Sequence, residues 1–310
     1  MDLIADIGAT NSRCALLDDA GDIARSESFL NSNFDSLESL LQHFVNIDAP
    51  VRGALAVAGP ITGDEIEMLN IDWRFSQQRL ADALGLDALH VLNDFEAIAH
   101  ALPLIAADDC HQIGGGHGHS DATKAVIGPG SGLGVATVAP HGNSWTVVSG
   151  EGGHVTVAAL DEAESRVIAD HADSNGHCSA ERLLSGPGLV RIYSSLARRA
   201  GKEAGELTPA AISASANEGD AFATKTYDLF FALLGTVAGN LALTVGARGG
   251  IYIAGGIVPR VIDALARSAF RERFVGKGRY RSYLEAIPTA VITAEVPAFI
   301  GLKAVLGYQN

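Results

Sequence analysis

The chain has 310 residues, a length that favours two lobes over a single hydrophobic core. Hydrophobic residues make up 47% of it and charged residues 19%, so we expect a folded protein and not a disordered tail. The formal net charge is −14, and its Lys and Arg residues are scattered except for a small cluster from Arg271 to Arg281, so binding to a nucleic-acid backbone is disfavoured.

The first predicted elements are two strands joined by a glycine turn. In residues 3–18 (LIADIGATNSRCALLD), an apolar run precedes Gly8 and a strand-like run follows Asn11. A Walker loop would instead need Gly-Lys, then Ser or Thr, and then a helix. The N–H groups of the turn, together with Thr10 and Asn11, could hold phosphate oxygens without a lysine. Taken alone, such a turn is more often an ordinary hairpin.

The next segments alternate between helix and strand patterns. Helical spacing of apolar residues predicts three helices, over residues 34–45, 75–84 and 95–102. Residues 90–92 predict a short buried strand, and this alternation indicates an α/β fold. Residues 110–123 (CHQIGGGHGHSDAT) are polar and rich in glycine, which predicts a surface loop near the lobe boundary. Their Cys and His spacing fits no closed zinc motif.

Asn93 and Asp94 follow the predicted strand and precede the helix over 95–102. This places them at the carboxyl end of a strand, where α/β proteins bind ligands. Both residue types also favour the N-cap of a helix, and the local sequence leaves the two interpretations open. As a functional residue, Asp94 would be a general base that accepts the proton of a hydroxyl attacking a γ-phosphate.

Two early patterns recur later in the chain, which predicts an internal duplication. Residues 125–138 (AVIGPGSGLGVATV) repeat the arrangement of strand, glycine turn and strand, and residues 53–61 (GALAVAGPI) resemble residues 249–257 (GGIYIAGGI). One phosphate-binding turn from each half could hold a nucleotide between two lobes. The additional residues of the second half fall between about Gly134 and Gly255.

Glu151 and His154 lie in a glycine-rich loop, residues 149–155 (SGEGGHV), between strand-like residues 145–148 and 155–157. The loop could be a plain turn with a polar rim. Glycines without steric bulk around a carboxylate and an imidazole also suit a small polyhydroxylated ligand. Glu181 could be a third acceptor, or only a favourable charge in the first turn of a helix.

Residues 229–247 carry no charge and are nearly long enough to cross a membrane. They include polar residues and glycines and have no basic flank, so we expect a buried helix. The chain has an odd number of cysteines without a CxxC spacing and begins without a signal-peptide pattern. Both features favour a reducing compartment, by default the cytoplasm.

Seven segments, in this order, resemble the bacterial glucokinase family of the hexokinase, actin and heat-shock chaperone superfamily: DIGATN, AVAGPITGD, LNDF, IGPGSGLGVA, GEGGHV, SAERLLSGPGL and IAGGIVPR. The resemblance covers almost the whole chain. It implies two ribonuclease-H-like α/β lobes with a cleft between them. The small lobe would comprise residues 1–104 and a returning C-terminal helix over 298–310, and the large lobe residues 105–297.

The resemblance also implies an ATP-dependent kinase that converts D-glucose to glucose 6-phosphate, the first step of glycolysis, in a cytoplasmic homodimer. Asp94 resembles the catalytic base. The glucose-binding residues correspond to Asn93, Asp94, Glu151, His154 and Glu181. The nucleotide-binding residues correspond to Ala5, Asp6, Ile7, Gly8, Ala9, Thr10, Asn11, Gly130, Ser131, Gly132, Gly255 and Gly256. Mg²⁺ would arrive with ATP, with Asp6 acting through water, and no resident metal is expected.

Two departures from the family pattern qualify this resemblance. Ala9 stands where the family usually has a second glycine, so a Cβ must fit near the phosphates. The C-terminal EVPAFIGLKAVLG also differs from the usual pattern, which leaves the packing of the last helix open. A kinase for another hexose, a non-catalytic sugar sensor and an actin-like polymerising ATPase are the alternative functions.

Overall fold

The computed structural model describes residues 1–68, 71–202, 205 and 207–308, and it has a mixed α/β fold. The chain divides into two compact units. Unit 1 consists of Met1–Ala106 and Ala294–Asn310, and unit 2 of Ala107–Thr293. The predicted lobe ranges include residues 69–70, 203–204, 206 and 309–310, which lie outside the described residues.

Unit 1 contains a five-stranded sheet with the order β3-β2-β1-β4-β7. Its strands are β1 (Asp2–Ile7), β2 (Asn11–Leu17), β3 (Ile23–Leu30), β4 (Arg52–Val57) and β7 (Ala88–Asn93). β1 is antiparallel to β2 and parallel to β4, and β4 is parallel to β7. The carboxyl ends of β1, β4 and β7 therefore lie along one edge of the sheet.

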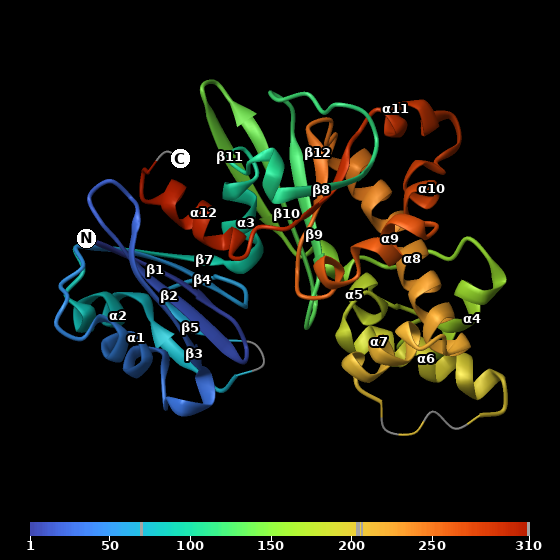
Figure 1. Cartoon of the computed structure of the whole chain (residues 1–310), viewed down its shortest axis with the longest axis horizontal. Coiled ribbons are helices and arrows are strands. Elements are labelled where there is room, and N and C mark those ends of the chain that lie inside the picture. The colour runs from blue at the N-terminus through green and yellow to red at the C-terminus, as the bar shows by residue number, and fades with distance from the viewer. Residues whose placement is uncertain (69–70, 203–204, 206, 309–310) are drawn as a thin grey trace. The chain divides into compact units, whose positions relative to one another are not determined.

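Helices cover both faces of this sheet. They are η1 (Asn31–Asn33), α1 (Leu37–Val45), α2 (Gln77–Leu84), α3 (Asp94–Ala101) and α12 (Pro297–Val305), and a small hairpin adds β5 (Glu65–Glu67) and β6 (Arg74–Ser76). Figure 1 shows α1 and α2 on one face and α3 and α12 on the other. The three helices predicted in this half are confirmed. They begin at residues 37, 77 and 94 because Ser36, Ser76 and Asn93 cap their N-termini.

Unit 2 contains a six-stranded sheet with the order β11-β10-β9-β12-β13-β8. The strands are β8 (Cys110–Gly114), β9 (Lys124–Pro129), β10 (Leu133–His141), β11 (Ser144–Gly150), β12 (Gly250–Ile253) and β13 (Thr289–Ile292). β9 is antiparallel to β10 and parallel to β12, and β12 is parallel to β13. Five of these strands repeat the order and directions of the sheet in unit 1, which confirms the predicted duplication.

The residues between β11 and β12 are mostly helical. The α-helices of unit 2 are α4 (Glu162–His171), α5 (Ala180–Leu183), α6 (Gly186–Arg199), α7 (Pro209–Asn217), α8 (Ala221–Val245), α9 (Ile262–Arg267), α10 (Phe270–Val275) and α11 (Arg281–Glu285). The short helices are η2 (Ala107–Asp109), η3 (Gly152–His154), η4 (Val258–Arg260) and η5 (Gly278–Tyr280). Within the described ranges, α8 is the one helix long and apolar enough to span a membrane, with a mean hydropathy of 1.6, but 61% of its apolar window is buried. It is a core helix, as predicted.

Two predictions in unit 2 need correction. The loop predicted over 110–123 begins as a strand, because residues 110–114 pair with β13 as the sheet edge. An edge strand tolerates the exposed His111 and Gln112, which made the segment look like a loop. The strand-like residues 155–157 form only an isolated bridge between Thr156 and Ser179.

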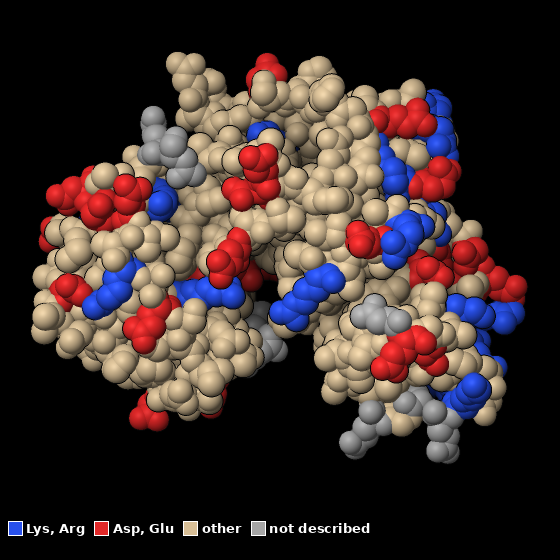
Figure 2. All heavy atoms as spheres, in the orientation of Figure 1, with Lys and Arg blue, Asp and Glu red and all other residues tan. Residues whose placement is uncertain are grey.

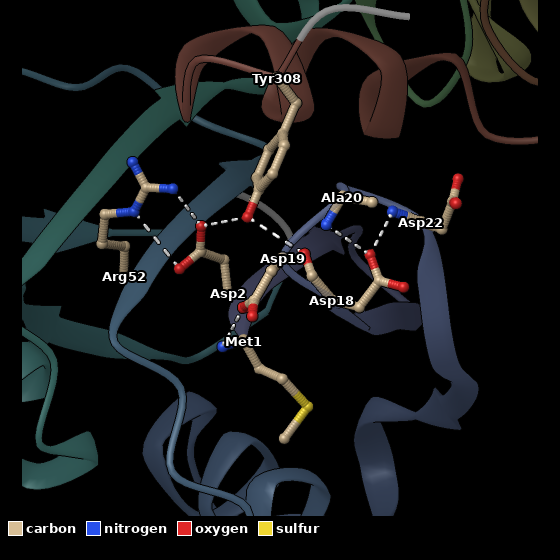
Figure 3. Close-up of polar contacts among 8 residues, drawn as sticks. All are labelled: Met1, Asp2, Asp18, Asp19, Ala20, Asp22, Arg52 and Tyr308. Atoms are coloured by element: carbon tan, nitrogen blue, oxygen red, sulfur yellow. Dashed lines mark hydrogen bonds and ion pairs between the residues drawn. The ribbon is translucent and has the colours of Figure 1, made fainter.

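The amino ends of β1 and β4 are tied to the C-terminal segment (Figure 3). The carboxylate of Asp2, which is 4% exposed, accepts hydrogen bonds from Arg52 and, at 2.8 Å, from the Tyr308 hydroxyl. Arg52 also donates to the carbonyl oxygen of Leu306 at 2.9 Å. Burial alone would raise the pKa of Asp2, but the hydrogen bonds from Arg52 and Tyr308 outweigh it and lower that pKa. The contact fixes the amino ends of β1 and β4, and the other end of β1 carries predicted site residues.

The last helix packs closely on α3 through Gly301. A Cβ at Gly301 would lie 1.8 Å from the carbonyl oxygen of Ala97 and 3.2 Å from the amide nitrogen of Ala101. Both alanines are fully buried. Because α3 begins at Asp94, this contact helps to place the predicted base, and the unusual C-terminal sequence is compatible with tight packing.

We predict that Gly301→Ala lowers the free energy of unfolding by about 1–3 kcal/mol, as overpacking of a core does. The higher helix propensity of alanine, about 1 kcal/mol, will not offset a clash with backbone. Urea unfolding followed by circular dichroism measures the change. Gly63→Ala is the matched control, because a Cβ at Gly63 meets nothing within 4 Å. Equal unfolding midpoints for the two variants would contradict the close packing.

Candidate active site

The first glycine turn, Gly8–Asn11, joins β1 to β2. The Gly8 amide donates to the Asn11 carbonyl oxygen at 3.0 Å, and a Cβ at Gly8 would lie 3.0 Å from that oxygen. The N–H groups of Ala9 and Thr10 have no acceptor in the described part of the chain. Adjacent free amides of this kind can bind an anion.

Ala9 does not strain the turn. Among the described residues, Asn46 is the one non-glycine residue with a positive φ, so Ala9 lies outside the left-handed region. A second glycine is therefore not required by the backbone conformation at this position.

Two of the residues predicted to contact the nucleotide lie within the sheet of unit 1. Ala5 and Ile7 are fully buried and are paired on both sides. Their side chains help to hold strand β1 in place, and their contact with a nucleotide stays a prediction. Asp6 lies between them and points to the opposite face of the sheet, because side chains alternate along a strand.

Asp6 and Asp94 are two partly buried carboxylates that interact at one sheet edge. The pKa of Asp94 is raised to about 6, first by burial and then by the negative charge of Asp6, and the hydrogen bond from the Phe95 amide opposes both. Burial also raises the pKa of Asp6, against the positive charge of Arg13. A carboxylate with a pKa near neutrality is a strong enough base to accept a proton from a hydroxyl in a transition state.

Asn93 is the N-cap of α3. Its Oδ1 accepts from the amides of Phe95 at 2.9 Å and Glu96 at 3.3 Å. Its Nδ2 donates to the Gly59 carbonyl oxygen at 3.1 Å. The capping interpretation is therefore confirmed. A side-chain hydrogen bond from Asn93 also lowers the pKa of Asp94, and the contact of Asn93 with a sugar stays a prediction.

The second glycine turn, between β9 and β10, is held by α5. The carboxylate of Glu181 accepts a hydrogen bond from the Leu133 amide through Oε2 at 2.9 Å. A Cβ at Gly132 would lie 2.4 Å from the same oxygen, and Gly130 accepts from the Gly186 amide at 2.8 Å. Glu181 thus supports the turn, a role that the sequence did not indicate. Its Oε1 atom makes no such hydrogen bond in the described residues and can accept one from a ligand.

Glu151 and His154 lie together on one short loop. His154 Nε2 is 3.9 Å from Glu151 Oε2, and their side chains are 57% and 70% exposed. A Cβ at Gly153 would lie 2.1 Å from the Leu133 carbonyl oxygen. A Cβ at Gly152 would lie 2.9 Å from the Val135 side chain. These glycines let the loop pack on β10. We had expected them instead to leave space for a ligand around Glu151 and His154.

Backbone hydrogen bonds connect this loop to the segment that carries Glu181. The Ala180 amide donates to the Val155 carbonyl oxygen, and the Val157 amide donates to that of Cys178, both at 2.9 Å. Unit 2 therefore brings the three predicted sugar-binding residues of this half onto two connected segments.

Gly255 and Gly256 follow β12 and lie beside the second turn. Gly255 has a φ of +85°, and a Cβ there would lie 2.4 Å from the Pro129 carbonyl oxygen. Gly256 is in open space, and a Cβ at Gly130 would lie 3.9 Å from its amide nitrogen. With the exposed Ser131, these glycines form a surface of accessible backbone at the carboxyl ends of β9 and β12.

Two arginines of the basic cluster noted in the sequence form ion pairs with carboxylates. Arg273 pairs with the fully buried Glu164 at 2.6 Å, and Arg281 pairs with Glu272 and with Glu285. On the face drawn in Figure 2, Lys and Arg appear in small patches, several of them beside Asp and Glu. The described ranges contain no group of three or more His, Cys, Asp or Glu placed to hold a metal.

Two residues near the first turn were not predicted. Arg13 lies opposite Asp6 where β1 and β2 run side by side. It follows the turn in the motif DIGATNSR, and this position is a sequence signal that could have identified it. Asn31 bonds directly to the turn, although it follows β3 and has no local sequence signal. A cavity of about 480 Å³ adjoins the turn and is lined by residues that include Ala9, Thr10 and Asn31.

Comparisons with known proteins agree with this arrangement. Residues 3–309 match the family model described as Glucokinase. The glucokinase of Nitrobacter hamburgensis is 42% identical over 305 residues, which cover 97% of this chain and 95% of that protein. A solved structure of a glucokinase from an Antarctic psychrotroph has a TM-score of 0.87 and 36% identity, and the match covers 98% of each chain.

A longer relative matches as well. The bifunctional protein glk of Paraburkholderia xenovorans is 41% identical over 311 residues, which cover 99% of this chain and 49% of that protein. The chain thus spans about half the length of this curated relative. Because the family model matches nearly the whole described sequence, the chain belongs to the glucokinase family.

Proposed function

We propose that the chain is a glucokinase that transfers the γ-phosphoryl group of ATP to D-glucose and forms glucose 6-phosphate, the first step of glycolysis, in the cytoplasm. The observation that carries the proposal is the carboxylate of Asp94, whose raised pKa of about 6 suits a general base. It interacts with Asp6 at the sheet edge where β1 leads into the first glycine turn. Membership of the glucokinase family supports the choice of substrate.

In this proposal the two units are lobes that close on their substrates. Glucose would bind to Asn93 and Asp94 in unit 1, and to Glu151, His154 and Glu181 in unit 2. The nucleotide would lie against the two glycine turns and Gly255–Gly256. Closure would exclude water, which otherwise competes with the sugar hydroxyl for the phosphoryl group. A homodimer is proposed from the family resemblance alone.

The proposed transfer is a single displacement. Asp94 accepts the proton of the sugar 6-hydroxyl while its oxygen forms a bond to the γ-phosphorus. The bond from that phosphorus to the bridging oxygen breaks, and ADP leaves. The free amides of Ala9 and Thr10 would stabilise negative charge on the phosphate oxygens, which is the role of a lysine in other phosphate-binding loops.

Mg²⁺ would enter as part of MgATP. Asp6 fits a contact to its water shell, because a nearby cation relieves the unfavourable ionisation of a buried carboxylate. Mg²⁺ commonly keeps several waters and uses few protein ligands when it binds with phosphates. The ion would neutralise charge on the transferring group.

The direct test is coupled detection of glucose 6-phosphate from ATP and glucose, repeated with mannose, fructose and N-acetylglucosamine. We expect the highest kcat/KM with glucose. A higher value for another hexose would assign the chain to that sugar. No turnover with any of them would favour a sensor or a polymerising ATPase, and light scattering with ATP distinguishes these two.

We predict that Asp94→Asn lowers kcat by at least about 100-fold and leaves glucose binding intact, because the amide cannot accept the proton. The raised pKa means that ionisation of Asp94 destabilises the folded state as pH rises from about 4 to 6. The variant should therefore be more stable than wild type at pH 7, by about 1–3 kcal/mol. Calorimetry measures glucose binding and thermal unfolding.

The matched control is Asp82→Asn, an exposed carboxylate on α2, which should change neither kcat nor stability appreciably. Turnover of Asp94→Asn within a few-fold of this control would reject the assignment of the base.

We also predict that Asp6→Asn lowers the pKa of Asp94 from about 6, because it removes a like charge that disfavours ionisation. The pKa is read from the carboxyl ¹³C resonance of Asp94 in the substrate-free protein, so the measurement does not depend on activity. In wild type, kcat should fall as pH drops through the Asp94 pKa. An Asp94 resonance that titrates at the same pH in both proteins would show that the two carboxylates do not interact.

A further inference from the structure

Asn31 is a buried polar residue that binds the first glycine turn from a distant part of the sequence. It follows β3 and begins η1, and it is 2% exposed. Its Nδ2 donates to the Gly8 carbonyl oxygen at 2.8 Å, and its backbone amide donates to the Thr10 carbonyl oxygen at 2.9 Å. Its Oδ1 accepts from the Ser12 hydroxyl at 2.7 Å. One residue thus contacts three alternate positions across the turn.

These hydrogen bonds set the direction of one of the two free amides, that of Ala9. In a trans peptide the carbonyl group and the next N–H group point to opposite sides of the chain. With the Gly8 and Thr10 carbonyls held toward Asn31, the N–H groups of Ala9 and Asn11 point away from it. The Ala9 amide is one of the two free donors at the tip of the turn.

The orientation of the Asn31 amide is itself fixed. The Gly8 carbonyl oxygen can only accept, so the Nδ2 group of Asn31 must face it. The Oδ1 atom then faces Ser12, which is fully buried and donates its hydroxyl hydrogen to it. An Asp at this position would present an oxygen to the carbonyl in place of a donor.

Packing does not hold the turn on the side of the cavity. Ala9 and Thr10 line the space of about 480 Å³, whose other walls include Phe34 and Trp73. The hydrogen bonds from Asn31 are therefore the contacts in the described structure that restrain the two carbonyls.

We propose that Asn31 is a positioning residue for the nucleotide: it orients the first glycine turn so that backbone amides face the phosphates. This inference rests on the proposed function, since it assigns the phosphates of ATP to that turn. In this proposal Asn31 acts on the nucleotide through the turn. Ser12 acts through Asn31, by occupying its Oδ1 and holding the side chain in place.

The test compares Asn31→Ala and Asn31→Asp with wild type. Both remove the donor to the Gly8 carbonyl, and a lost partner for a buried group weakens an interaction by about 10-fold or more. We expect the Kd for ADP, measured by calorimetry on the substrate-free enzyme, and the KM for ATP to rise about 10-fold or more. The Kd and KM for glucose should stay within about twofold.

Ser12→Ala should raise the same nucleotide constants by a smaller factor, about 2- to 5-fold, because Asn31 keeps its donor to the Gly8 carbonyl but loses the hydrogen bond that holds its Oδ1. It also preserves the test if the Asn31 variants fail to fold. Asn33→Ala is the matched control, since Asn33 is exposed on the same short helix. It should leave all four constants unchanged.

Equal ADP affinity in Asn31→Ala and the control would overturn the inference. A parallel loss of glucose and ADP affinity would also overturn it, because it would indicate a general structural role. The proposed function is tested separately. If ADP affinity depends on Asn31 but the wild-type protein makes no glucose 6-phosphate, the kinase function is rejected and the positioning role of Asn31 is retained.

Discussion

Asp6 and Asp94 repel each other when both are ionised, and the rest of unit 1 must stabilise the fold against this repulsion. Burial raises the pKa of both carboxylates, and each ionised group makes the other less favourable. Such a pair persists only where the surrounding fold over-determines it. The parallel strands β1, β4 and β7 supply one constraint, the α12 contact on α3 a second, and the hydrogen bonds among Asp2, Arg52 and Tyr308 a third. The unfavourable free energy of placing the two carboxylates together is thus offset by contacts within the sheet, on α3 and at the amino ends of β1 and β4.

The two duplicated sheets hold their glycine turns in the same way. In each unit a glycine turn follows a central strand, and in each unit a residue far away in the sequence holds the turn. Asn31 holds Gly8 and Thr10 in unit 1, and Glu181 holds Leu133 in unit 2. A glycine turn offers backbone donors because it lacks side chains, and for the same reason it cannot fix its own conformation by packing. An external polar side chain supplies the missing restraint in both cases.

This division explains what the sequence could and could not predict. Helices α1, α2 and α3, the buried α8 and the duplicated strand pattern were predictable, because they depend on local periodicity and on repeated motifs. Asn31 could not be found in this way, since its partners lie about 20 residues away across a hairpin. The support that Glu181 gives to the second turn, the packing role of Gly152 and Gly153, and the edge strand β8 depend on contacts between segments. The motif residues Ala5 and Ile7 are fully buried in the sheet, so their side chains also serve the fold, a role that the motif alone does not distinguish from binding.

The charges around the first turn also bear on the form of the nucleotide. The turn offers neutral amides and no lysine, and Asp6 and Asp94 lie at the same edge, with Arg13 as the cation whose charge acts on Asp6. A bare triphosphate would add its negative charge to that of the two carboxylates, and in a poorly solvated site this repulsion is strong. In the proposed function, Mg²⁺ that arrives with the phosphates would reduce that repulsion and would favour the ionised form of both carboxylates. In the proposed function, the missing lysine and the carboxylate pair therefore have a common explanation. The positive charge arrives with the substrate as Mg²⁺, and the general base becomes fully ionised when the substrate is bound.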